Sequence, residues 1–163
     1  MPNYCDNEIR FDCDEKQFDE IIRPLLSGED CNGDLKELTF NSIVPMPDDI
    51  YRGPLGEEER QQYGKKNWYD WSYANWGCKW DVMDSNVNSE SRIVWFTTAW
   101  CPPMGWYAAL ARELDVHGIT AHVNFYAEGG FPGSLGGLEL EDGEVIDSEA
   151  DDDFAEGYEE EEE

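Results

Sequence analysis

The chain lacks three features, and each absence excludes a class of protein. No apolar run approaches the ~20 residues that a membrane-spanning helix needs, and no signal peptide precedes the first strand-like segment. The five cysteines are odd in number and include no Cys-x-x-Cys pair, so we expect neither a disulfide framework nor a zinc site. We therefore expect a soluble cytoplasmic protein with reduced thiols.

Positive charge is missing from the end of the chain. From Glu139 to Glu163 there are fifteen Asp and Glu residues and no Lys, Arg or His. All eleven Lys and Arg lie before residue 139, where twenty-three acids outnumber them, and the whole chain carries −27. Such a field repels phosphate backbones and anionic membranes and attracts basic protein surfaces. We therefore expect no direct binding to nucleic acid or membranes, and a basic protein as the partner.

The rest of the chain has the composition of a folded domain, with 13% aromatic and 40% hydrophobic residues. The last residues differ, because a block of like charges cannot bury enough apolar area to offset the entropy of ordering. We predict one α+β domain over residues 1–146, with an insertion near 48–80, and a disordered acidic tail over 147–163.

Hydrophobic periodicity predicts an alternation of strands and helices. Strands are expected over 4–13, 38–44, 91–99 and 119–126, helices from Asp14 and from near Pro103, and a closing hairpin or edge strand over 138–146. Asp14 and Gln17 have the spacing of a capping box, and Pro24 should distort the first helix. This order is typical of a ferredoxin-like split βαβ sandwich, an antiparallel sheet with two helices on one face.

Five short motifs support this fold class. They are MPNYCDN at the start, NSIVPMP at 41–47, NWGCKWDV at 75–82, FTTAWCPP at 96–103 and YAEGG at 126–130. In this order they resemble the YubB-like family of phage and plasmid proteins with a ferredoxin-like domain. The resemblance spans roughly residues 1–138 and implies a mobile-element origin and a bacterial host cytoplasm. It implies no catalytic residues, and the acidic end lies outside its pattern.

The aromatic segment around residues 76–81 is one candidate site. Trp76, Lys79, Trp80 and Asp81 bring opposite charges close to indole faces, which could hold a base, a peptide or a cation. The alternative is that the tryptophans cover one face of the sheet while Lys79 and Asp81 pair at its rim. The sequence leaves both interpretations open.

A catalytic interpretation rests on Cys101, which lies where a helix N-terminus could activate its thiol. With His122 and Asp81 it could form a nucleophile set, and the chain would then be an enzyme or a small-ligand binder. No recognised hydrolase signature surrounds Cys101, and a buried small thiol at a turn is the favoured explanation. We therefore expect no catalytic residues, no cofactor and no metal.

The acidic residues provide the leading interpretation. Carboxylates on a protein surface can imitate phosphates and occupy a basic groove that normally binds DNA or RNA. We select Asp48, Asp49, Glu57, Glu58 and Glu59 in the insertion and Asp151, Asp152 and Asp153 near the end, with further acids on the first helix. The predicted function is non-enzymatic inhibition of a basic nucleic-acid-handling host protein, of the anti-CRISPR or anti-restriction type. The alternatives are a merely solubilising tail, or a structural protein of the mobile element that forms a homodimer through its sheet.

Overall fold

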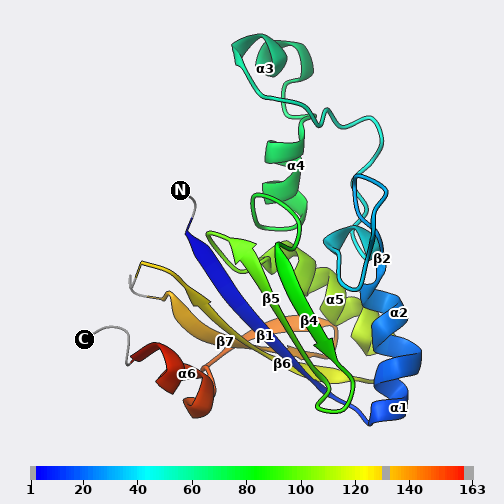
Figure 1. Cartoon of the computed structure of the whole chain (residues 1–163), viewed down its shortest axis with the longest axis vertical. Helices are drawn as coiled ribbons and strands as arrows, with labels where there is room; N and C mark the ends of the chain where they lie inside the picture. Colours follow the sequence, from blue (N-terminus) through cyan, green and yellow to red (C-terminus); the bar gives the residue numbers. More distant parts are fainter. Residues whose placement is uncertain (1–2, 130–132, 160–163) are drawn as a thin grey trace.

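The computed structural model describes residues 3–129 and 133–159, and its centre is a six-stranded sheet (Figure 1). The strands are β1 (Tyr4–Asp12), β4 (Asp84–Asn88), β5 (Ile93–Ala99), β6 (Thr120–Ala127), β7 (Leu135–Glu141) and β8 (Glu144–Ser148). They lie in the order β4-β5-β1-β6-β7-β8, and every neighbouring pair is antiparallel. The first four of these positions form the split βαβ order of a ferredoxin-like domain, which confirms the predicted fold class. The β7–β8 hairpin widens the sheet beyond β6.

Two helical segments cover one face of the sheet. The first runs continuously through α1 (Glu15–Gln17), the π-helical segment η1 (Phe18–Ile22) and α2 (Arg23–Leu26), and the second is α5 (Met104–Val116). Asp14 begins the first segment with the predicted capping box to Gln17. The π-helical segment ends at Ile22, two residues before Pro24, whose missing backbone N–H distorts the helix as expected.

The core lies between this helical layer and the sheet. Phe40, Phe96 and Trp106 meet with ring centroids 4.9 to 5.9 Å apart, and Trp76 joins them at 5.8 Å from Phe40. All four side chains are fully or almost fully buried. Aromatic rings of this size supply a large share of the buried apolar area in a small domain.

The prediction of a strand over residues 38–44 is wrong. This segment forms only a 3-10 turn, η2 (Phe40–Ser42), next to a minimal hairpin of β2 (Gly28–Glu29) and β3 (Leu35–Lys36). Thr39 caps the turn through its side chain, and Phe40 donates its backbone N–H to Asp81 at 2.7 Å. The second strand of the ferredoxin-like order is instead the polar β4, whose sequence DSNVN gives little strand signal.

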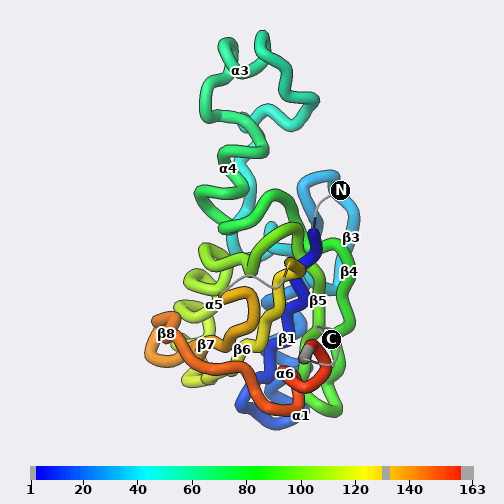
Figure 2. Tube along the Cα trace, turned by 90° about the vertical axis from the view of Figure 1, so that its left-hand side faces the viewer, coloured from blue at the N-terminus to red at the C-terminus, as the bar shows by residue number. Residues whose placement is uncertain are grey.

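The insertion forms an arm that projects from one end of the sheet (Figures 1 and 2). It contains the short helix α3 (Glu57–Tyr63) near its tip and α4 (Trp68–Asn75) near its base. Stacking of Tyr51 on Tyr63, with ring centroids 4.3 Å apart, closes the tip. Trp68 donates its Nε1–H to Gly53 at 2.9 Å, which ties the outgoing and returning halves of the arm together.

The acidic end of the chain is ordered further than the sequence predicts. We expected disorder from residue 147, but β8 extends to Ser148 and a last helix, α6 (Asp152–Glu159), follows it. This helix lies against the face of the sheet opposite α2 and α5 (Figures 1 and 2). Residues 160–163 lie outside the described part of the chain. Among the described residues, no helix combines the length and apolar character needed to cross a bilayer.

Candidate functional site

The open face of the sheet carries polar side chains in cross-strand rows. Because side chains alternate along each strand, Asp6, Glu8 and Arg10 of β1 lie on this face while Cys5, Asn7 and Ile9 point into the core. The register places Arg10 opposite His122 of β6, and His122 opposite Glu139 of β7. The alternation of β6 places His122 on this open face, between Ala121 and Val123, which point into the core.

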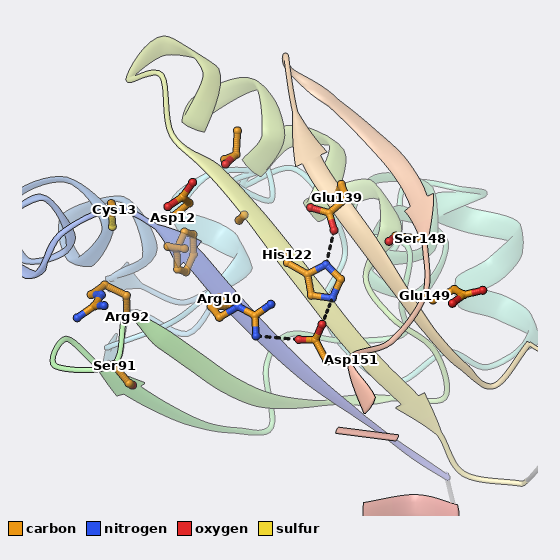
Figure 3. Close-up of a pocket in the computed structure, with 13 residues that line it drawn as sticks. Arg10, Asp12, Cys13, Ser91, Arg92, His122, Glu139, Ser148, Glu149 and Asp151 are labelled. Carbon is orange, nitrogen blue, oxygen red and sulfur yellow. Dashed lines mark hydrogen bonds and ion pairs between the residues drawn. The ribbon is translucent and has the colours of Figure 1, made fainter. Parts of the chain in front are cut away.

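Asp151 is the centre of the interactions on this face (Figure 3). Its Oδ2 lies 2.8 Å from Arg10 Nη1 and accepts a hydrogen bond from Asn124 Nδ2 at 3.1 Å, while its Oδ1 lies 3.4 Å from His122 Nε2. Burial acts to raise the pKa of Asp151, but hydrogen bonds from Asn124 and Arg10 and the charges of His122 and Arg10 outweigh it and lower that pKa. The carboxylate is therefore held in its charged form just before α6 begins.

Asn124 joins Asp151 to the sheet and is fully buried, although it points away from the hydrophobic core. Its Oδ1 accepts the backbone N–H of Asp151 at 2.8 Å, and its Nδ2 also donates to Glu8 at 3.2 Å. The amide group thus uses both its donor and its acceptor atoms. A buried amide that lost these partners would be costly, so Asn124 favours the docked position of the chain at residue 151.

His122 links the same cluster to β7. Its Nδ1 is hydrogen-bonded to Glu139 Oε1, and its Nε2 lies 3.0 Å from Asn124 Oδ1. Both ring nitrogens therefore lie within hydrogen-bond distance of side-chain oxygens, so His122 ties Asn124 of its own strand to Glu139 of β7.

Aromatic side chains hold the other end of α6. Tyr158 stacks on Tyr126 of β6 with ring centroids 4.2 Å apart, and Phe154 packs on Tyr158 at 5.0 Å. The Tyr158 hydroxyl donates to Asp6 at 2.6 Å. An eight-residue helix is not stable in isolation, so these contacts and the Asp151 cluster explain why α6 forms at all.

A glycine allows the chain to cross the sheet on its way to α6. A Cβ atom on Gly137 would lie 2.3 Å from the carbonyl oxygen of Glu149, closer than real Cβ contacts occur. The backbone at residues 149–150 therefore passes directly over β7. Only glycine at position 137 permits this approach without displacing the crossing segment.

Two hollows flank the Arg10–Asp151 ion pair. The first, with a volume of about 570 Å³, is polar and contains both charge signs, with Arg10, Arg92 and His122 near Asp12, Glu139 and Glu149 (Figure 3). The second has a similar volume of about 570 Å³ and is lined by Glu8, Arg10, Ile93, Asp151, Asp152, Asp153 and Phe154. Because Arg10 is already paired with Asp151, this second hollow has an excess of carboxylates, and we name it the acidic groove.

A known protein family includes most of the strands, and the helix, that form this open face. A family model described as a ferredoxin-like domain in Api92-like protein matches residues 75–163, more than half of the chain. The chain belongs to this family. No curated protein and no solved structure matches it.

The Api92-like match includes the acidic end of the chain. The motifs that resemble the YubB-like family end near residue 138, whereas the Api92-like match extends through α6 to residue 163. The acidic end is therefore part of the family domain. The first strand, the first helical segment and most of the arm precede the matched residues.

The predicted acidic residues do not form one surface. Asp152 and Asp153 are exposed at the first turn of α6, where carboxylates favour the positive end of the helix dipole. The acids of the insertion, Asp48, Asp49, Glu57, Glu58 and Glu59, lie on the arm instead. There Asp48 and Asp49 lie 4.0 and 3.9 Å from Arg52 and Lys66, so basic residues offset part of the negative charge of the arm.

The aromatic segment at 76–81 divides between core and surface. Trp76 is 1% exposed and donates its Nε1–H to Val44 at 2.9 Å, so it is a core residue. Lys79 lies over the ring of Trp80 at 4.6 Å, and both are half-buried. Asp81 accepts hydrogen bonds from Thr39, Phe40 and Val82, and burial raises its pKa. Its position anchors η2, and the suggested pairing of Lys79 with Asp81 is not among the ion pairs of the described residues.

The alternative nucleophile set is not assembled. The Cys101 thiol donates to the carbonyl of Gly77 at 3.2 Å and packs against the core, whereas His122 lies on the open face of the sheet. Burial raises the pKa of Cys101 and therefore disfavours the thiolate. Among the described residues, no group of three or more His, Cys, Asp or Glu is arranged to hold a metal ion.

Several residues of the site have no individual sequence signal. Arg10, Asn124, Tyr126, Gly137 and Tyr158 contribute to it only through strand register and through the crossing at residue 149. The alternation of β1 and β6 could have assigned Arg10, Asn124 and Tyr126 to the open face. It could not have indicated that the acidic end returns to cover them.

Proposed function

We propose that this chain is a non-enzymatic interaction protein that binds a basic, nucleic-acid-handling protein and blocks its nucleic-acid site. The observation that carries the proposal is the docked α6, which presents Asp152, Asp153 and Glu156 to solvent beside the acidic groove. A surface of carboxylates on a folded scaffold can replace the phosphates that such a partner normally binds.

Docking of α6 strengthens this proposal compared with a disordered tail. A disordered acidic segment would lose conformational entropy on binding and would mainly speed association. Here the Asp151 cluster and the Tyr126–Tyr158 stack fix the helix before a partner arrives. Pre-organised carboxylates bind with a smaller ordering cost.

The partner is expected to be rich in Lys and Arg. The chain carries −27, and its field extends over about a Debye length of ~8 Å at physiological salt. Binding should therefore weaken as salt is added. The same charge disfavours nucleic acid itself and anionic membranes as partners.

The resemblance of five motifs to the YubB-like family supports a mobile-element origin. We propose that the chain comes from a phage or plasmid and acts in the cytoplasm of a bacterial host, where a restriction, CRISPR or repair component would be its target. Placement of the gene among other mobile-element genes would support this origin, and placement among conserved chromosomal genes would contradict it.

The test is an affinity capture from bacterial lysate at low and high salt with two matched variants. The first variant, Asp152→Asn/Asp153→Asn/Glu156→Gln, removes three exposed charges from α6 and keeps the Asp151 anchor. The second, Glu20→Gln/Glu37→Gln/Glu90→Gln, removes three exposed charges elsewhere. We expect the wild type and the second variant to retain a basic nucleic-acid-binding protein that the first variant loses. Equal capture by both variants would contradict the proposal.

A second candidate function is binding of a small aromatic ligand. A cavity of about 180 Å³ lies at the base of the arm, lined by Trp68, Trp76 and Trp80 together with Asp30, Cys31, Asn32, Met46, Arg52, Ser72 and Asp81. If the cavity binds such a ligand, a planar heteroaromatic compound should raise the melting temperature of the wild type but not that of the Trp80→Ala variant. The acidic surface plays no part in that function.

A further inference from the structure

Five large apolar side chains are exposed on chain segments that meet at the end of the sheet from which the arm projects. They are Tyr4, Tyr73, Met83, Trp100 and Met104, each 37% to 44% exposed. We name them the Trp100 patch. Figure 1 shows the start of β1, the end of β5 and the base of α4 at this end of the molecule. The patch belongs to neither the acidic groove nor the cavity at the base of the arm.

Backbone contacts bring together the strand ends that carry Tyr4, Met83 and Trp100. Tyr4 is the register partner of Ala99, and Trp100 donates its backbone N–H to the carbonyl of Asn3 at 2.8 Å. Met83 donates its own N–H to Thr97, two residues before Ala99, at 3.0 Å. The patch therefore spans the ends of β1 and β5 and the start of β4.

Close packing of two helices adds Tyr73 and Met104. A Cβ atom on Gly105 would lie 2.3 Å from the carbonyl of Asn75, and Trp106 donates its N–H to Trp76 at 3.1 Å. The end of α4 is therefore fixed against the start of α5. Met104 begins α5, and Tyr73 lies in the last turn of α4, so both side chains stand on rigid supports.

Trp100 itself has an unusual backbone conformation. Its φ of 72° lies in the left-handed region, which is uncommon for a residue other than glycine and is strained for a bulky one. The conformation is held by the bond to Asn3 and by the Cys101 N–H, which donates to Ala99 at 2.9 Å. It leaves a tryptophan 44% exposed, although this residue type is usually largely buried. Strain of this kind is concentrated at functional sites.

The charge around the patch indicates its occupant. Glu128 is exposed and donates its backbone N–H to Tyr4 at 3.0 Å, and the exposed Asp84 follows Met83 directly. A second copy of this chain would bring another net −27 and the same carboxylates against them, which disfavours self-association. A surface of Trp, Tyr and Met bordered by carboxylates instead fits an apolar pocket bordered by Lys or Arg.

We propose that the Trp100 patch is a second contact site for the basic protein partner, with Trp100 as the anchor that enters an apolar pocket. The inference rests on the proposed function for the charge of that partner. The acidic groove supplies long-range attraction, and the Trp100 patch supplies short-range apolar contact that salt does not screen.

The test uses two labelled peptides and fluorescence anisotropy with the full-length chain. One peptide is an amphipathic helix of Leu and Lys, and the other has the same number of Lys with Ser in place of Leu. The variant Trp100→Gly removes the indole and relieves the left-handed strain, so folding is retained. Met104→Gln is a second variant, and Val116→Ser, at a residue 77% exposed on the far end of α5, is the control.

We expect the Leu–Lys peptide to bind the wild type at least about tenfold more tightly than the Ser–Lys peptide, as a single buried hot-spot residue can provide. Trp100→Gly and Met104→Gln should reduce this ratio and Val116→Ser should not. Equal binding of both peptides by the wild type, or an unchanged ratio in Trp100→Gly, would overturn the proposed contact.

Two further outcomes separate this inference from the proposed function. Binding of the Leu–Lys peptide alone, lost in Trp100→Gly, would support the patch and contradict the electrostatic role of the acids. A concentration-dependent dimer in sedimentation, abolished by Trp100→Gly, would assign the patch to self-association and overturn the inference.

Discussion

Arg10 and Asp151 form an ion pair of 2.8 Å that joins the first strand to the start of the last helix. These residues are 141 positions apart in the sequence, and their pairing places an acidic helix over the open face of the sheet. The pair also separates the two hollows of that face. It is therefore the contact on which the position of the acidic surface depends.

Removal of the arginine should release α6 while leaving the domain folded. The pair is partly exposed, so we expect Arg10→Ala to lower the free energy of unfolding by only about 1 kcal/mol. Amide exchange at residues 152–159 should accelerate far more than exchange in β1 or β6, because α6 depends on docking. Arg112→Ala, at an exposed arginine of α5, is the control. Unchanged exchange in α6 would show that the pair does not hold the helix.

Docking of α6 should also be lost in acid. The folded state lowers the pKa of Asp151 from its ordinary value of 3.8, so the folded protein binds fewer protons than the unfolded one near that pH. The stabilisation is therefore complete above pH 3.8 and is lost as the pH falls through the lower folded-state pKa. The NMR signals of Tyr126 and Tyr158 should report this transition. Asp151→Asn should abolish it, and persistence of the transition in that variant would assign it to another group.

A substitution at Gly137 tests the docking of α6 without changing any charge. Gly137→Ala places a methyl group where Glu149 crosses β7, so the segment before α6 must move and the helix should undock. Gly157→Ala is the matched control, because its Cβ meets open space on α6 itself, and there alanine should favour the helix by ~1 kcal/mol. We expect opposite changes in the circular-dichroism signal of the helix. A Gly137→Ala protein with the wild-type spectrum would contradict the crossing geometry.

The two tryptophans of the 76–81 segment should behave differently. Trp76 is buried among Phe40 and Trp71, and Trp76→Ala should cost about 3–5 kcal/mol in urea unfolding. Trp80 is half-buried and lies under Lys79, so Trp80→Ala should cost much less. Similar losses for both variants would mean that Trp80 also belongs to the core.

The sequence predicts those parts of the fold whose signals are local. The capping box at Asp14, the strand over 119–126 and the helix from near Pro103 are each confirmed, because they depend on signals within a few residues. The strand predicted at 38–44 is wrong because its β-branched and aromatic residues serve a capped turn held by Asp81, a contact 41 residues away. Tertiary contacts of this kind override local propensity.

The candidate site was predictable only in part. Asp151, Asp152 and Asp153 were selected for their charge, and all three lie at or beside the acidic groove. Charge alone predicted disorder, since fifteen acids in the last segment repel one another. The apolar contacts of Phe154 and Tyr158 and the buried Asn124 reverse that outcome for residues up to 159. No periodic pattern in so short a segment indicates where it docks.

Competition with nucleic acid tests the central claim most directly. A labelled oligonucleotide is bound to the purified basic protein that affinity capture identifies, and the full-length chain is then added. We expect the chain to displace the oligonucleotide. The Asp152→Asn/Asp153→Asn/Glu156→Gln variant should require a concentration at least about tenfold higher, because it lacks three of the carboxylates that compete with phosphate. A ternary complex of chain, partner and oligonucleotide would contradict the account.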